Sequence, residues 1–151
     1  MKILFATDGT KYSECALEII GRFNFSVGDE LKIITVVDLA VPFAVDIYAG
    51  YLPSTSEIEQ ALKENAERIV SSTKEKIHSL FPDAAFSLTT EVLIGSPENK
   101  IVEAATRIKA DLVIVGSHGY NRLERILLGS VSDSVVHHAP CSVMVIRTVK
   151  D

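Results

Sequence analysis

A stretch rich in glycine is the part of this sequence whose residue types point most directly to chemistry. Residues 116–130 read GSHGYNRLERILLGS and hold Gly116, Gly119 and Gly129. Glycine lets a backbone turn sharply and approach a ligand closely. An apolar run precedes the stretch and a short helical pattern follows it. Because the free amides and the dipole at a helix start favour an anion, the stretch predicts a phosphate cradle built mainly from backbone.

The same stretch has a second interpretation, in which the glycines only shape a turn before a capped helix. Glycine-rich loops are common, so their spacing alone is weakly specific. Two other phosphate-binding signatures are missing from the sequence. It has no GxxxxGK[ST] pattern, and no GxGxxG follows the first strand-like run. A P-loop enzyme and a dinucleotide-binding fold are therefore both disfavoured.

A second candidate for ligand chemistry is the sequence ATDG, residues 6–9, which ends the first strand-like run. A carboxylate beside a triphosphate makes sense mainly when a magnesium ion or a sugar hydroxyl lies between them. Asp8 is therefore a candidate for such a contact, and a role as a helix cap or turn residue is the alternative. Ser130 and Ser132 would add hydroxyl donors at the start of the helix that follows the glycine stretch.

The elements that must position these residues alternate between strand-like runs and helical patterns. The runs are apolar and rich in β-branched residues, whereas the helical stretches repeat apolar residues every three or four positions. Strands are expected at residues 2–7, 31–37, 86–94, 111–116 and 141–147. Helices are expected at residues 11–23, 56–80, 97–110 and 130–138.

Three of the helix starts carry capping signals. Ser56 and Glu59 have the spacing of a capping box at the start of the long second helix. Ser96 precedes a proline, which suits a cap followed by the first helical position. Ser130 and Asp133 could form a further cap. These signals support the expected boundaries.

Strands that alternate with helices predict an α/β fold, a single doubly wound domain spanning residues 1–151. A parallel sheet of five strands, in the order 3-2-1-4-5, would carry helices on both faces. Ligands of such sheets bind beyond the carboxyl ends of the strands, where the strand order reverses. If the first and fourth strands are neighbours, Asp8 and the glycine stretch face one crevice.

The composition limits the class of protein. The chain has 151 residues, of which 47% are hydrophobic and 23% charged, and its formal net charge is -5. These values are ordinary for one soluble domain, and the acidity argues against nucleic acid as a partner. No apolar run approaches the ~20 residues of a membrane-spanning helix. Two cysteines far apart in sequence are typical of reduced thiols. We therefore expect a cytoplasmic protein that binds no membrane.

Taken together, these motifs show that the sequence resembles the universal stress protein family. Its glycine stretch matches the pattern Gly-x2-Gly-x9-Gly-Ser without a gap, through Gly116, Gly119, Gly129 and Ser130. The segments ILFATDGT, TVVD, GSPENKIVEAA, DLVIVGSHG and LLGSVSDSVVHHAPCSVMVIR extend the resemblance over the whole chain. The resemblance implies an ATP-binding domain that usually forms a homodimer.

The resemblance also implies a role for individual residues. Asp8 would meet the ribose or a bound Mg²⁺, and Val36 would contact adenine partly through its backbone. The other implied nucleotide contacts fall in three groups along the chain. They are Ala6 and Thr7 beside Asp8; Val115, Gly116, His118 and Gly119 around the sugar and phosphates; and Gly129, Ser130, Val131 and Ser132 around the triphosphate.

Three functions remain open at this point. The first is a regulatory module that binds ATP with Mg²⁺ and couples its occupancy to conformation or partner choice during stress. The second is a slow ATPase or a phosphate-transfer enzyme, although the sequence offers no convincing base or activated nucleophile and no catalytic residue is assigned. The third is a scaffold dimer whose nucleotide is structural.

Two further expectations concern partners. The last strand is a candidate edge, and a bare apolar edge invites pairing. Two copies would then pair their last strands antiparallel about a two-fold axis and form a homodimer. Residues 38–56 form a long connection with apolar content. This connection is expected to cover the adenine or to face a partner protein.

Overall fold

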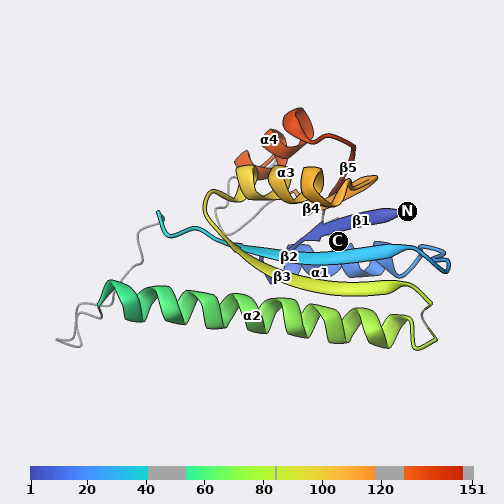
Figure 1. The fold of residues 1–151 in the computed structure, drawn as a ribbon, viewed down its shortest axis with the longest axis horizontal. Helices are drawn as coiled ribbons and strands as arrows, with labels where there is room; N and C mark the ends of the chain where they lie inside the picture. Colours follow the sequence, from blue (N-terminus) through green and yellow to red (C-terminus); the bar gives the residue numbers. More distant parts are fainter. Residues whose placement is uncertain (41–53, 84, 118–127, 148–151) are drawn as a thin grey trace.

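The computed structural model describes residues 1–40, 54–83, 85–117 and 128–147, and for residues 11–14 the backbone alone. Within these residues, five strands alternate with four helices (Figure 1). The strands are β1 (Lys2–Ala6), β2 (Glu30–Val37), β3 (Ser87–Ile94), β4 (Leu112–Gly116) and β5 (Ser142–Ile146). The helices are α1 (Lys11–Ile20), α2 (Thr55–Leu80), α3 (Pro97–Ile108) and α4 (Ser130–His138).

The strands form one parallel sheet in the order β3-β2-β1-β4-β5. Helices α3 and α4 cover one face of the sheet and α1 and α2 cover the other (Figure 1). The predicted fold class, strand order and helical layers are therefore confirmed. Right-handed crossovers account for this arrangement. The connections from β1 to β2 and from β2 to β3 run one way across the sheet and put α1 and α2 on one face, whereas those from β3 to β4 and from β4 to β5 run the other way and put α3 and α4 on the opposite face.

The core consists of two apolar clusters, one on each face of the sheet. Side chains of β1 alternate between them: Ile3 and Phe5 join the cluster under α1 and α2, whereas Leu4 joins the cluster under α3 and α4. All three side chains are at most 1% exposed. A central parallel strand is buried on both faces, which is why its sequence is a continuous apolar run rather than an alternating one.

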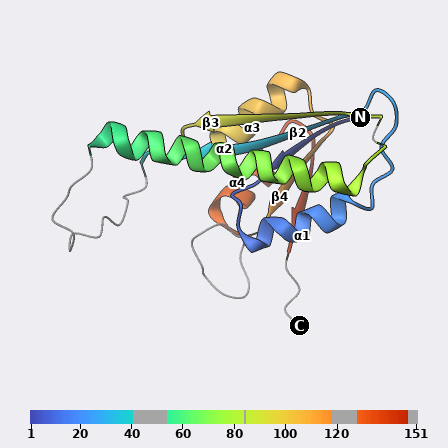
Figure 2. The ribbon, with the colours of Figure 1, turned by 90° about the horizontal axis from the view of Figure 1, so that it is seen from below.

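Helix α2 is the longest element, and its amino-terminal turns extend past the carboxyl ends of the strands (Figures 1 and 2). Its buried residues lie from residue 66 onward, where it crosses the sheet. They are Ala66, Val70, Thr73 and Ile77. Ile69, next to Val70, is half-buried. No helix in the described ranges is long and apolar enough to cross a bilayer.

Some helix boundaries differ from the expected ones. The capping box of α2 joins Ser54 and Glu57, not Ser56 and Glu59. Both pairs have the Ser-x-x-Glu spacing, and the earlier pair gives the longer helix. Helix α1 ends at Ile20 rather than at residue 23. In α4, Gly129 is the N-cap residue, so Ser130 is the first helical residue and not the cap.

Candidate functional site

The carboxyl ends of β1 and β4 lie side by side in the sheet. Ala6, the last residue of β1, pairs with Val115 of β4 and with Ile34 of β2. The chain therefore leaves β1 towards Asp8 at the edge where β4 ends in Gly116. The strand order reverses at this pair, which confirms the adjacency that the candidate site requires.

The turn after β1 is held by its own polar side chains. Asp8 Oδ1 accepts hydrogen bonds from the Thr10 amide at 3.0 Å and from Thr10 Oγ1 at 2.7 Å. The Gly9 amide donates to Thr7 Oγ1 at 3.2 Å, and Gly9 has a φ of 73°. Asp8 thus forms the local turn expected of aspartate after a strand. Neither of these bonds uses its Oδ2, which leaves that oxygen for a cation or a sugar hydroxyl.

A second set of hydrogen bonds joins the end of β4 to the start of α4. The Gly129 amide donates to the Ser117 carbonyl at 2.9 Å. Ser132 Oγ lies 2.9 Å from the Gly129 carbonyl and 3.3 Å from the Ser117 carbonyl. The Ser117 amide in turn donates to the Ile146 carbonyl at 2.8 Å, on β5. Ser117 and Gly129, which flank residues 118–128 of the glycine stretch, are therefore held at the same edge of the sheet.

The amino terminus of α4 supplies backbone donors at this edge. The first hydrogen bond of the helix runs from the Asp133 amide to the Gly129 carbonyl. The amides of Ser130, Val131 and Ser132 come before it and have no acceptor within the helix. Ser130 is exposed, so this end of the helix is open to a ligand. Such an end attracts anions because its amides and its dipole act together.

An apolar wall lies next to these donors, on the face covered by α3 and α4. Ala6 of β1, Val36 of β2 and Val131 of α4 are half-buried against the same cluster. Val115 is a buried member of that cluster, with 3% of its surface exposed. Because β2 continues for three residues beyond Ile34, the partner of Ala6, Val36 stands past the end of β1. A flat apolar group could lie against this wall.

The structure therefore brings most of the predicted site residues to one edge of the sheet. They are Ala6, Thr7, Asp8, Val36, Val115, Gly116, Gly129, Ser130, Val131 and Ser132. His118 and Gly119 lie outside the described residues. The sequence analysis did not include Ser117, a residue that is 2% exposed and whose carbonyl accepts the bonds from Gly129 and Ser132. Its position directly after Gly116 was the signal that could have indicated it. Contact of these residues with a nucleotide stays a prediction.

Asp8 is the predicted metal ligand at this edge. Within the described residues, no three His, Cys, Asp or Glu side chains gather closely enough to hold a metal ion. Mg²⁺ is commonly held by one or two carboxylates together with phosphate oxygens of a substrate and water. Asp8, whose Oδ2 is not used by the two bonds to Thr10, could supply one such carboxylate.

Comparison with known proteins decides the family. The family model described as "Universal stress protein family" matches residues 1–147. The chain belongs to the universal stress protein family. Universal stress protein MJ0577 of Methanocaldococcus jannaschii is 30% identical over 152 residues, which cover 97% of this chain and 94% of that protein.

Solved structures of the family share the fold. That of MJ0577 superposes with a TM-score of 0.75 at 28% identity, covering 99% of this chain and 97% of the other. A universal stress protein solved in complex with cAMP gives a TM-score of 0.64 at 23% identity, with coverages of 99% and 98%. A family member from Arabidopsis thaliana with AMP bound gives 0.69 at 18% identity, with coverages of 100% and 94%. The last two likenesses concern the fold.

Proposed function

We propose that this universal stress protein binds an adenine nucleotide, ATP with Mg²⁺, and acts as a nucleotide-dependent regulatory module in the stress response. One observation carries the proposal: the turn that contains Asp8 and the open amino terminus of α4 both lie at the edge where β1 and β4 are neighbours. This edge therefore offers a carboxylate, helix amides without an acceptor in the helix and an apolar wall. These are the groups that a sugar, a phosphate chain and a base require.

Each group has a distinct task in the proposed complex. The amides of Ser130 and Val131 would bind phosphate oxygens, because they have no acceptor in the helix. Asp8 Oδ2 would hold a ribose hydroxyl or Mg²⁺, which neutralises phosphate charge when bound. Val36 and Ala6 would contact the base. His118 and Gly119 keep their predicted place beside the sugar and phosphates.

The fold neighbours support the choice of an adenine nucleotide. Two proteins with this fold carry cAMP and AMP in their solved structures. A triphosphate is proposed here because the helix start supplies several amides rather than one. The first experiment is therefore calorimetric titration of nucleotide-stripped protein with magnesium-ATP and, separately, with AMP. Tighter binding of ATP supports the phosphate cradle, and binding of neither ligand would contradict the proposal.

A charge placed at the helix start tests the phosphate site without threatening the fold. Ser130→Glu puts a carboxylate at the first helical position, which is favourable for the helix itself. The same carboxylate would repel a phosphate, so ATP affinity should fall more than about tenfold, since like charges at this range interact by several kcal/mol. Val136→Glu adds the same charge on an exposed position later in α4 and should leave the affinity nearly unchanged.

We further propose that the protein is a homodimer joined through β5, which is an edge strand of the sheet. The Ile146 carbonyl accepts a hydrogen bond from Ser117, so the backbone polar groups of Ile146 point towards β4. Polar groups of neighbouring residues in a strand point in opposite directions. The amides of Val143 and Val145 therefore point to the free edge, where a second copy could pair antiparallel.

Proline substitutions separate this interface from the fold. Val145→Pro removes an amide that points outward and keeps the bonds to β4, because proline is tolerated on edge strands in that position. It should give a folded monomer by light scattering. Ile146→Pro removes an amide that faces β4 and should lower stability instead. A dimer mass that persists in the Val145→Pro variant would exclude pairing through β5.

A further inference from the structure

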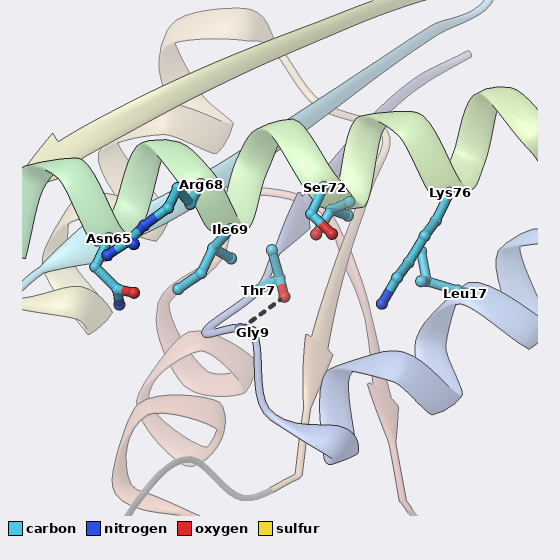
Figure 3. Close-up of a pocket in the computed structure, with 9 residues that line it drawn as sticks. Thr7, Gly9, Leu17, Asn65, Arg68, Ile69, Ser72 and Lys76 are labelled. Carbon is cyan, nitrogen blue, oxygen red and sulfur yellow. Dashed lines mark hydrogen bonds between the residues drawn. The ribbon is translucent and has the colours of Figure 1, made fainter.

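A polar groove lies on the face of the sheet opposite the apolar wall of the candidate nucleotide site. Helix α1 packs over β4 and β5, whereas α2 packs over β2 and β3. The space between the two helices lies over the end of β1 and has a volume of about 350 Å³. This volume is at the lower end of the range of small-molecule sites. The lining residues are Thr7, Gly9, Leu17, Asn65, Arg68, Ile69, Ser72, Thr73 and Lys76 (Figure 3).

The lining offers many hydrogen-bond donors and two positive charges. Arg68 and Lys76 are cationic, Asn65 and Ser72 carry donors, and none of the nine described lining residues is acidic. Thr7 Oγ1 accepts a bond from the Gly9 amide, and this bond does not use the hydroxyl proton of Thr7. A ligand that fits such a lining presents acceptor oxygens with negative charge. The net charge of the chain is -5, so a cationic lining is a local feature.

Four polar residues of the groove belong to one face of α2. Asn65, Arg68, Ser72 and Lys76 follow one another at intervals of three, four and four residues, which places them on the same side of a helix. In Figure 3, Arg68 extends towards Asn65 and Lys76 extends towards Leu17 of α1. The two cations are eight residues apart, roughly 12 Å along the helix axis.

Arg68 is the cation of the groove that has no ion-pair partner among the described residues. The part of the chain that the structure describes places no carboxylate within ion-pair distance of it, whereas the nearby Lys63 pairs with Glu59 at 2.7 Å. Arg68 is exposed, so its replacement leaves the core intact. A guanidinium can bind a carboxylate or a phosphate through two parallel hydrogen bonds.

We propose that this groove binds a small molecule that carries a phosphoryl or carboxylate group. The groove lies on the α1 and α2 face of the sheet, whereas Ala6 and Val36 of the candidate nucleotide site face α3 and α4. Thr7 is a predicted contact of the nucleotide site and also lines the groove. The two sites share one structural element. Gly9 lies against Ile69 of α2, so the turn that contains Asp8 also forms the floor of the groove.

The experiment titrates the protein with inorganic pyrophosphate and with citrate, as phosphate and carboxylate probes, at low ionic strength. Amide shifts in two-dimensional NMR spectra locate the bound probe. We expect shifts at Gly9, Ser72 and their neighbours, and binding about fivefold or more weaker in Arg68→Ala, because a charge-assisted hydrogen bond is lost. Lys63→Ala is the matched control. It removes the same charge from the same helix, about 140° round its axis from Arg68.

The outcomes separate the groove from other modes of binding. Weakening in Arg68→Ala with little change in Lys63→Ala supports the groove, and the stronger of the two probes identifies the anionic group. Equal weakening in both variants would show attraction by diffuse surface charge and would overturn the proposal. So would shifts confined to Ser130 and its neighbours, because the probe would then occupy the candidate nucleotide site alone. None of these readouts requires that ATP binds.

Discussion

At the scale of single residues, Gly9 shows why the turn after β1 depends on glycine. Its φ of 73° lies in the left-handed region, a backbone conformation that residues with a β-carbon rarely adopt. A β-carbon built on Gly9 would lie 2.8 Å from Ile69 Cγ1 and 3.2 Å from Ile69 Cγ2. Two separate constraints, one from the backbone and one from α2, therefore act on this position.

A pair of glycine substitutions separates these constraints. Gly9→Ala should lower the free energy of unfolding by about 2–4 kcal/mol, the sum of left-handed strain and overpacking. Gly28→Ala is the control, because Gly28 has a φ of 93° and a β-carbon added there would meet no atom within 4 Å. It should lose about 1–2 kcal/mol, from strain alone. Urea unfolding measures both changes.

The packing part of the loss should be recovered by a second substitution. In Gly9→Ala combined with Ile69→Ala, the methyl group added at Gly9 occupies space that Ile69 has vacated. The double variant should then be more stable than the sum of the single losses predicts. Additive losses, or equal losses at Gly9 and Gly28, would show that α2 does not constrain the turn.

Ser132 is a second residue whose role depends on geometry. The sequence predicts a phosphate contact, and the structure places its hydroxyl within reach of the Gly129 and Ser117 carbonyls, with 2% of the residue exposed. Ser132→Ala should lower the free energy of unfolding by about 1 kcal/mol, the usual worth of such a bond. Ser130→Ala, at an exposed position, should leave unfolding unchanged. Urea unfolding measures both changes. Equal stability of the Ser132→Ala and Ser130→Ala variants would show that the hydrogen bonds of Ser132 do not stabilise the fold.

At the scale of elements, Glu91 joins three parts of the fold. This β3 residue receives a hydrogen bond from Arg107 of α3 at 2.7 Å and an ion pair from Lys32 of β2 at 2.8 Å. Burial raises the pKa of the Glu91 carboxyl, but the bonds from Lys32 and Arg107 outweigh burial and hold the pKa below its ordinary value of 4.5. The edge strand is thus fixed to its neighbour and to a helix.

The lowered pKa of Glu91 predicts a pH dependence of stability. Its contribution is complete above the unfolded pKa of about 4.5 and is lost as the pH falls through the lower folded pKa. Glu91→Gln should therefore cost about 1 kcal/mol at neutral pH, a modest value because water screens the half-exposed Arg107. The difference from the natural chain should shrink as the solution is acidified below that range.

The control for this prediction is Glu30→Gln on β2. Glu30 lies 3.5 Å from the Lys2 ammonium, and both side chains are well exposed, at 50% and 43%. Its substitution should change unfolding little at any pH. Urea unfolding over a series of pH values compares the two variants. A Glu91→Gln difference that grows on acidification would contradict the assigned sign.

At the scale of the whole molecule, the two ends of the sheet carry different groups of residues. The candidate nucleotide site lies at the carboxyl ends of the strands, and an aromatic cluster lies at the other end. Phe25 stacks on Phe86 with ring centroids 4.1 Å apart and meets Phe81 edge-on at 5.2 Å. These rings join the segment before β2, the end of α2 and the start of β3. The cluster closes the core under α1 and α2.

This separation predicts that stability and binding respond to different substitutions. Phe25→Ala should lower the free energy of unfolding by about 2 kcal/mol, because it removes the ring contacts with Phe81 and Phe86 and leaves a cavity. Its affinity for magnesium-ATP, measured by calorimetry on folded protein, should be unchanged. Phe23→Ala is the milder control, since its ring lies 6.0 Å from that of Phe25. A loss of affinity in Phe25→Ala would show that the two ends are coupled.

Much of the architecture could be predicted because its signals are local. The runs that form β1 and β4 are apolar throughout, as strands buried on both faces must be. The spacing from Gly116 to Ser130 pointed to an anion site without any knowledge of the fold. Boundaries were less certain, because Ser54 and Ser56 are followed by glutamate at the same spacing and local sequence does not choose between them.

The sequence by itself determined the family, the order of the elements and the residues of the candidate nucleotide site, since each depends on motifs of neighbouring residues. Tertiary structure decided which of these residues meet. It put the ends of β1 and β4 side by side, turned the hydroxyl of Ser132 towards two carbonyls, and brought Arg68 and Thr7 to one groove. Such contacts join residues that are far apart along the chain, and their geometry depends on how helices pack on the sheet, which no local pattern encodes.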